Sequence, residues 1–213
     1  MPSVKIITPI SGGNYYHIFN RGINRQPIFF REANYLYFLH LLEKYLTPYV
    51  SVLAYCLLPN HFHLVIKVKG EIRLPAWQEG IPSLSKDGIH ITDDTQIGKW
   101  VSHQFRRMFI TYSMAINKQE NRSGSLFDKN FKRLEITENE YLKYVVYYTH
   151  FNAEKHCLLE DFRKYKYSSF GALTSLKTTK IDRDLVYEIF EGKDGFEEYH
   201  QGIHVEREGY ILE

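Results

Sequence analysis

The run LPNHFHLVIKV, residues 58–68, constrains the fold of this chain more than any other stretch. Its second half is rich in β-branched residues and has the length of a strand, and the Pro-Asn pair near its start is typical of a turn. Because alternate side chains of a strand share a face, we expect His61 and His63 to point one way and Phe62 the other. Two imidazoles side by side on a rigid strand form half of a metal site. The ordinary alternative is a pair of half-exposed polar residues, so a metal site needs a further ligand elsewhere.

The overall composition is that of a soluble globular protein with one domain and appendages. The chain has 213 residues, of which 44% are hydrophobic and 24% are charged, and its net charge is +2. So small a net charge says little about nucleic acid, and only local clusters of basic residues bear on that question. No run of about 18 apolar residues is present, so we expect no membrane span.

The expected location is the cytoplasm. Residues 1–13, MPSVKIITPISGG, lack the apolar core of a signal peptide. Cys56 and Cys157 do not have the spacing of a metal-binding pair, and Cys56 lies within an apolar strand pattern. This use of cysteine fits a reducing compartment.

Hydrophobic periodicity predicts the order strand, helix, strand, strand, helix, strand, followed by a further helix. The expected strands cover residues 14–20, 51–58, 58–68 and 131–136, and the expected helices cover residues 31–46, 95–117 and 137–155. Thr95 is the expected cap of the second helix, and Thr137 forms a capping box with Glu140 at the start of the third. This order is that of a ferredoxin-like α+β sandwich, with a mostly antiparallel sheet and helices packed on it.

Two regions stand apart from this pattern. Residues 69–94 are rich in Gly, Pro, Ser and Asp without a sustained period, which predicts a long inserted loop. Residues 162–173 are expected to dock onto the core as a strand or turn. Two short helices, at 182–190 and 195–201, predict a helical C-terminal extension over residues 179–213, attached to a domain of residues 1–178.

Basic residues cluster in two places. Arg21 and Arg25 flank the turn after the first strand, and Lys129, Lys132 and Arg133 make the most basic short stretch of the chain. Such residues are ordinarily solvated, but they would serve equally to bind the phosphates of a nucleic acid.

The helix after Thr137 carries polar groups in a regular spacing. Tyr148 and Asn152 are four residues apart and therefore lie on one face, one turn apart. An Asn amide oxygen is a neutral ligand for a hard cation, and a Tyr one turn away can reach a phosphate held on that cation. Because the chain contains 17 Tyr and 14 Phe, a tyrosine-rich amphipathic helix is the alternative interpretation.

Five segments in succession resemble the motifs of one family. They are YYHIFNRGINRQPIFF (15–30), LPNHFHLVIKV (58–68), GSLFDKNFKR (124–133), YLKYVVYYTHFNAEKH (141–156) and YKYSSF (165–170). In this order they resemble the motifs of the one-tyrosine HUH transposases, and most closely the branch called REP-associated tyrosine transposases, relatives of the single-strand insertion-sequence transposases. The resemblance covers most of residues 14–172.

The resemblance implies a role for each residue that matches a motif. His61 and His63 would bind a divalent metal, Mg²⁺ or Mn²⁺, through the His-hydrophobic-His motif, with Asn152 as the third ligand. Tyr148 would be the nucleophile of a metal-dependent transposase that cleaves single-stranded DNA next to hairpins. Attack by its hydroxyl on phosphorus gives a 5′-phosphotyrosine link and a free 3′-hydroxyl, which is strand transfer rather than hydrolysis. The expected partners are single-stranded or hairpin DNA and, if the site is completed in trans, a second copy in a homodimer.

The chain departs from the family pattern at two points. Asn152, Ala153 and Glu154 stand where the family usually has Asn-Pro-Val, which keeps the amide but changes how the helix ends. The insertion 69–94 is longer than the family pattern. Two other functions remain open: a metal-dependent nuclease in which water is the nucleophile, and a non-catalytic ferredoxin-like module that binds nucleic acid through exposed aromatics.

Overall fold

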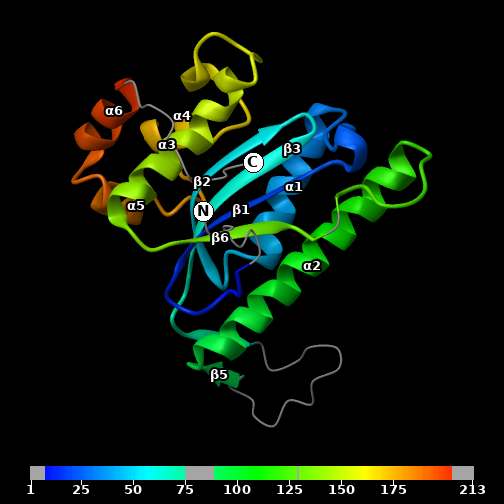
Figure 1. Cartoon of the computed structure of the whole chain (residues 1–213), viewed down its shortest axis with the longest axis horizontal. Helices are drawn as coiled ribbons and strands as arrows, with labels where there is room; N and C mark the ends of the chain where they lie inside the picture. The colour runs from blue at the N-terminus through cyan, green and yellow to red at the C-terminus, as the bar shows by residue number, and fades with distance from the viewer. Residues whose placement is uncertain (1–7, 75–88, 129, 203–213) are drawn as a thin grey trace, which may run out of the picture.

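A four-stranded antiparallel sheet with the strand order β2-β3-β1-β6 forms the centre of the fold in the computed structural model, which describes residues 8–74, 89–128 and 130–202 (Figure 1). The strands are β1 (Tyr15–Arg21), β2 (Val50–Leu58), β3 (His61–Val68) and β6 (Lys132–Ile136). The three long helices are α1 (Glu32–Tyr45), α2 (Asp94–Gln119) and α3 (Asn139–Lys155). The order β1-α1-β2-β3-α2-β6, with β1 and β3 in the middle of the sheet, is the predicted ferredoxin-like α+β topology.

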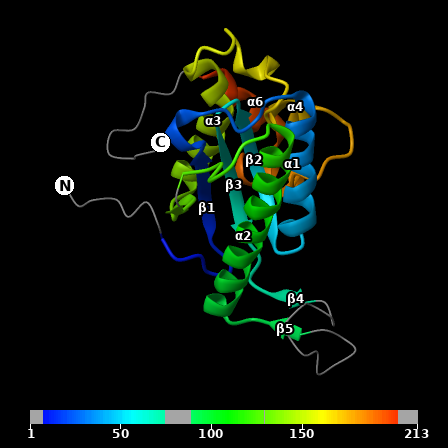
Figure 2. The same ribbon diagram turned by 90° about the vertical axis from the view of Figure 1, so that its right-hand side faces the viewer.

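The two faces of the sheet are covered by different helices (Figures 1 and 2). On one face, the ring of Phe62 lies 5.1 Å from that of Phe38 in α1 and 5.6 Å from that of Phe109 in α2, measured between centroids. On the other face, the ring of His63 lies 6.0 Å from that of Tyr148 in α3. The alternation of side chains along β3 thus sorts aromatic core residues to the first face and histidines to the second.

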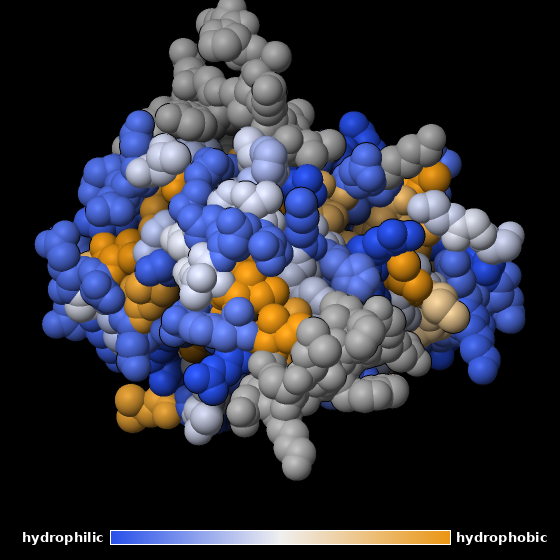
Figure 3. All heavy atoms as spheres, turned by 90° about the horizontal axis from the view of Figure 1, so that it is seen from below, coloured by the Kyte–Doolittle hydropathy of each residue, from blue (hydrophilic) through white to orange (hydrophobic). Residues whose placement is uncertain are grey.

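Most large apolar side chains are buried between these layers. The underside of the molecule in Figure 3 is mostly hydrophilic, with scattered apolar groups. Among the described residues, no helix combines the length and the apolar character needed to cross a membrane.

The helix starts differ from those predicted. The side chain of Asp93 accepts a hydrogen bond from the Gln96 backbone N–H at 2.8 Å, so Asp93 caps α2 and Thr95 is already inside the helix. The predicted capping box is absent, because α3 begins after Glu138, which makes no side-chain cap. Several polar residues near each start could serve as caps, and the local pattern alone does not select among them.

The insertion contains two short strands, contrary to the prediction of a loop throughout 69–94. Strand β4 (Ile72–Leu74) pairs antiparallel with β5 (Ile89–Ile91), and the side chains of Ile72 and Leu74 are buried. Strands of three residues are too short to produce a clear period in the sequence. The residues between the two strands, Trp77 among them, lie outside the described part of the chain.

The segment after α3 docks onto the edge of the sheet, as predicted. It contains the short helices η2 (Phe162–Lys164) and α4 (Phe170–Thr174). Between them, the Leu57 N–H donates to the Tyr167 carbonyl at 2.9 Å and the Ser169 N–H donates to the Tyr55 carbonyl at 2.9 Å. These bonds cover the outer edge of β2, which would otherwise expose unpaired backbone groups.

The extension contains α5 (Arg183–Ile189) and α6 (Lys193–Gln201), close to the two predicted short helices. Elsewhere in the chain, the short helix η1 (Ile23–Arg25) follows β1. Phe196 of α6 is fully buried, and Tyr199 of the same helix packs its ring 6.2 Å from that of Tyr147 in α3. The extension therefore packs against the same helix that carries Tyr148.

Candidate functional site

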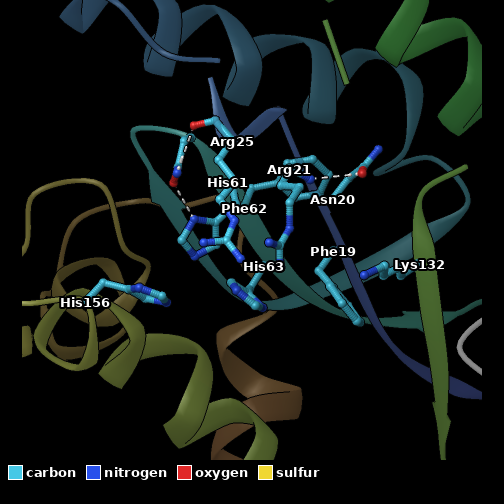
Figure 4. A pocket seen from close by; sticks show the side chains of 10 residues that line it. Phe19, Asn20, Arg21, Arg25, His61, Phe62, His63, Lys132 and His156 are labelled. Carbon is cyan, nitrogen blue, oxygen red and sulfur yellow. Dashed lines mark hydrogen bonds between the residues drawn. The ribbon is translucent and has the colours of Figure 1, made fainter. Parts of the chain in front are cut away.

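The two histidines of β3 lie on one face, as expected, and open onto a cleft of about 250 Å³ (Figure 4). Their ring centroids are 5.3 Å apart and the rings are nearly perpendicular. In the sheet, His63 is paired with Phe19 of β1 on one side and with Cys56 of β2 on the other. The cleft is lined by Phe19, Asn20, Arg21, Arg25, Asn60, His61, Phe62, His63, Lys132 and His156.

His63 is buried and neutral. Its Nδ1 lies 2.9 Å from Nε2 of His17, and its own Nε2 has no hydrogen-bond partner among the described residues. Burial, followed by the neighbouring His17 and His61, keeps the pKa of His63 well below its ordinary value. An imidazole ligand must be neutral to offer a lone pair, so this environment favours the form that binds a metal.

His61 is half-buried, and its neutral tautomer follows from one contact. Its Nδ1 lies 2.7 Å from Oδ1 of Asn60, whose Nδ2 donates to the Arg25 carbonyl at 3.2 Å. Because an amide oxygen only accepts, the proton of a neutral His61 ring is on Nδ1. Nε2 then carries the lone pair.

Tyr148 packs beside these histidines from α3 and is only 2% exposed. Its ring meets those of His63 and His17 edge to face, with centroid distances of 6.0 and 6.5 Å. Nζ of Lys155 donates a hydrogen bond to the Tyr148 hydroxyl at 3.2 Å and lies 4.9 Å from the ring centroid. The hydroxyl of Tyr148 is thus held by a cation from its own helix.

Asn152 lies one turn after Tyr148 and is fully buried. Its Nδ2 donates to the Tyr148 carbonyl at 2.7 Å, whereas its Oδ1 has no hydrogen-bond partner within the part of the chain that the structure describes. A buried acceptor without a donor is rare and calls for an explanation such as a ligand or ion.

The donor types limit which ion could bind. No group of three or more His, Cys, Asp or Glu side chains among the described residues could hold a metal ion. Of the three predicted ligands, His61 and His63 line the cleft, whereas Asn152 is not among its lining residues. The predicted donor set would combine the two imidazoles with the amide oxygen of Asn152. Such a donor set carries no charge and suits a divalent ion that accepts both nitrogen and oxygen.

The predicted DNA-binding residues separate into two groups. Arg21, Arg25 and Lys132 line the cleft, and the Lys132 ammonium lies 5.6 Å from the ring centroid of Phe19. Arg133 follows Lys132 in the strand and therefore points to the opposite face, where its Nε donates to the Thr8 carbonyl. Its role in DNA binding stays a prediction, and Lys129 lies outside the described residues.

Three residues of this region were not singled out from the sequence. His17 contacts His63, Lys155 contacts Tyr148, and the exposed ring of His156 lies 4.6 Å from that of His61. His17 shares the period-two alternation of β1 with Phe19, which was a usable signal. Lys155 lies seven residues after Tyr148 in the same helix, so the helical period was a usable signal for it as well. The contact of His156 with His61 depends on how α3 docks, which no local pattern reveals.

The end of α3 explains the position of Lys155. Ala153 and Glu154, which stand where the family usually has Pro-Val, are both helical, and α3 continues through Lys155. Ala153 is buried against Cys56, and Oε2 of Glu154 accepts a hydrogen bond from the Phe162 N–H at 3.1 Å. The departure from the family pattern therefore leaves the helix regular up to the lysine.

The neighbouring tyrosines face other parts of the molecule. Tyr147 stacks on Phe151 at 5.6 Å and meets His200 of the extension at 5.7 Å. Tyr144 lies 6.2 Å from Tyr148, one turn earlier in the helix. Of the three, Tyr148 is the one whose ring meets His63 within the described contacts.

Comparison with known proteins yields a likeness of fold. No family model and no curated protein matches the sequence. A solved structure described as a REP-associated tyrosine transposase bound to a REP hairpin is similar, with a TM-score of 0.53 and 16% identity. The match covers 78% of this chain and 81% of that chain. The chain thus has the fold of this class of transposase, which confirms at the level of the fold the resemblance drawn from the motifs.

Proposed function

We propose that this protein is a metal-dependent transposase that cleaves and rejoins single-stranded DNA next to hairpins through a 5′-phosphotyrosine intermediate. One observation carries the proposal. The Tyr148 hydroxyl accepts a hydrogen bond from the Lys155 ammonium at 3.2 Å, and the Tyr148 ring meets that of the buried His63 edge to face at 6.0 Å. The motif resemblance and the fold of the solved transposase support the same conclusion.

His61, His63 and Asn152 would hold the ion. When bound, Mg²⁺ or Mn²⁺ supplies positive charge that polarises the scissile phosphate, and Mn²⁺ accepts imidazole more readily. Because all three ligands are neutral, the protein contributes no negative charge that would repel the phosphate. Arg21, Arg25 and Lys132 in the cleft contribute further positive charge along the DNA backbone.

Tyr148 performs the covalent step. Its Oη forms a bond to phosphorus, and the bond from phosphorus to the 3′ oxygen breaks. The tyrosine loses its hydroxyl proton, and the released 3′ oxygen gains one. The Lys155 ammonium, already a hydrogen-bond donor to Oη, stabilises the phenolate that attacks. Attack by a 3′-hydroxyl on the phosphotyrosine reverses these changes and rejoins a strand. Because Tyr148 is buried in the DNA-free chain, we expect the entering strand to open its packing against His17 and His63.

The adduct itself tests this proposal. A labelled hairpin oligonucleotide with single-stranded flanks, incubated with the protein and Mn²⁺, should yield a covalent adduct that survives denaturation. Tyr148→Phe should lose the adduct and all cleavage, and Tyr147→Phe, the matched control on the same helix, should retain most activity. A chelator should abolish cleavage and added Mn²⁺ should restore it. Cleavage by Tyr148→Phe without an adduct would favour the nuclease that uses water, and a protein that binds no divalent ion would favour the non-catalytic module.

Salt dependence tests the path of the DNA. Lys132→Ala should lower the salt slope of DNA affinity by about one counterion, because its ammonium lines the cleft. Arg133→Ala is the comparison, since this neighbour points to the opposite face: an unchanged slope confines the DNA to the cleft, and an equally lowered slope supports the predicted role of Arg133. Titrations at several salt concentrations measure both slopes. An unchanged slope for Lys132→Ala would show that the backbone does not contact this residue.

A further inference from the structure

His17 is a buried histidine that the proposed chemistry does not use directly. It lies on β1 opposite Val65, so His63 is its diagonal neighbour across the strand pair. The two rings are nearly parallel, at 18°, with centroids 5.1 Å apart, and Phe19 stacks on His17 at 4.8 Å. His17 does not line the cleft, and it contacts the site through His63, Tyr148 and Phe19.

One proton is shared between the two rings, and its position decides what His63 can do. The nitrogens that meet are Nε2 of His17 and Nδ1 of His63, 2.9 Å apart. Burial lowers the pKa of His17 to about 3 and that of His63 well below its ordinary value, so both rings are neutral. If His63 donates from Nδ1, its Nε2 carries a lone pair toward the site. If His17 donates instead, Nε2 of His63 carries a hydrogen and cannot bind an ion.

We propose that His17 is a positioning residue, the acceptor that holds His63 in its Nδ1–H tautomer with Nε2 presented to the metal. The inference rests on the proposed function and deepens it. Metal-bound histidines almost always donate their second N–H to a carboxylate, a carbonyl or a water. Here the acceptor is a neutral imidazole, which orients the ring and adds no negative charge. The full charge of the ion is thereby kept for the phosphate.

The hydrogen-bonding pattern supports this arrangement over its reverse. Nδ1 of His17 and Nε2 of His63 both lack hydrogen-bond partners among the described residues, and an unmet buried polar group costs about 1–3 kcal/mol. The protein therefore tolerates an incomplete network at this place. An ion on Nε2 satisfies His63 only if the proton is on Nδ1 of His63, which requires His17 to accept.

Tautomers can be read without any metal or DNA. In the metal-free protein labelled with ¹⁵N histidine, long-range ¹⁵N–¹H correlations should show His63 protonated at Nδ1. His17→Phe keeps an aromatic ring but removes the acceptor, and it should shift His63 toward the other tautomer. It should also weaken Mn²⁺ binding, measured by electron paramagnetic resonance, by about 10- to 100-fold. His17→Gln retains an acceptor oxygen and should lie closer to the wild type.

The controls separate this inference from the function on which it rests. His103→Phe removes an exposed histidine of α2 and should bind Mn²⁺ as the wild type does. If the wild type binds Mn²⁺ and folded His17→Phe binds it equally well, the positioning role is wrong and the proposed function stands. Protonation of His63 at Nε2 in the wild type also overturns the inference, and this measurement does not depend on any variant folding. If the wild type binds no Mn²⁺, the proposed metal centre fails, and the inference fails with it.

Discussion

Two buried histidine pairs in this molecule have the same distance between their facing nitrogens and opposite surroundings. His17 and His63 approach to 2.9 Å between β1 and β3, and His150 and His200 approach to 2.9 Å between α3 and α6. All four side chains are at most 2% exposed. What differs is the hydrogen bonding of the outward nitrogens, which are the two ring nitrogens of each pair that do not face the partner ring.

The second pair is closed. Nδ1 of His200 donates to the Phe196 carbonyl at 2.8 Å, so its Nε2 accepts from Nδ1 of His150. Nε2 of His150 then accepts from the hydroxyl of Ser169 at 2.7 Å. Every ring nitrogen has a partner in one consistent order of donors and acceptors. A fully satisfied buried network of this kind is typical of hydrogen bonds that stabilise the packing of two elements.

The first pair is open. Its outward nitrogens, Nδ1 of His17 and Nε2 of His63, have no hydrogen-bond partners in the described part of the chain. Because burial without hydrogen bonds is costly, such a pair persists only where something else requires it. An unsatisfied buried histidine is therefore a better indication of a site than burial, which both pairs share, or a lowered pKa, which His17, His63 and His150 share.

Removing the extension tests the closed pair most severely. A chain ending at residue 178 loses Val186 and Phe196, both fully buried, and each such side chain contributes about 1.5–3 kcal/mol. It also leaves His150 without its partner, at a further cost of about 1–3 kcal/mol. Together these losses approach the whole stability of a typical domain. We expect no cooperative unfolding transition by circular dichroism, and a truncated chain that melts cooperatively would make the extension an independent appendage.

Crossed substitutions sharpen the comparison. His63→Ala should abolish adduct formation and lower the free energy of unfolding by about 1–2 kcal/mol, because it leaves only Nε2 of His17 newly unpaired. His150→Ala should lower that free energy by about 3 kcal/mol, since it leaves His200 and Ser169 unpaired. Where it folds, it should still form the adduct. Urea titration and the adduct assay measure both effects. If His63→Ala destabilises the protein more than His150→Ala does, the assignment of open and closed pairs is wrong.

Acid should destabilise the metal-free protein through these histidines. The folded pKa of His17 is lowered to about 3, and that of His150 is also well below its ordinary value, in both cases by burial. On acidification, the unfolded chain therefore binds protons at these histidines that the folded chain does not bind. The associated stability is complete above about pH 6.5 and is lost on acidification, by about 1.4 kcal/mol per pH unit for each such histidine. For His17 the loss continues down to about pH 3.

The variant His17→Phe isolates the contribution of one ring. Urea unfolding of the wild type and of this variant between pH 7.5 and 5 gives two slopes, and the variant should have the shallower one. Equal slopes would show that His17 titrates alike in the folded and unfolded chains, contrary to its burial.

Properties that depend on neighbours along the chain were predictable from the sequence. The shared face of His61 and His63 follows from the period of a strand, and the spacing of Tyr148 and Asn152 follows from the period of a helix. The order of strands and helices predicted the sheet and its fold. These features are set by the local geometry of the backbone, which repeats over a few residues. That repeat is visible in the sequence as a regular spacing of apolar and polar residues.

The tertiary structure alone decided which side chains meet across elements. His156 reaches His61, and His17 reaches His63, because the docking of α3 and the register of β1 against β3 bring them together. The same holds for the closed pair that joins α6 to α3. Docking and register are set by the burial of the whole core, a sum over many weak contacts between distant segments. A short stretch of sequence does not determine contacts between distant segments, so the contacts between elements at the site could not be predicted from the motifs.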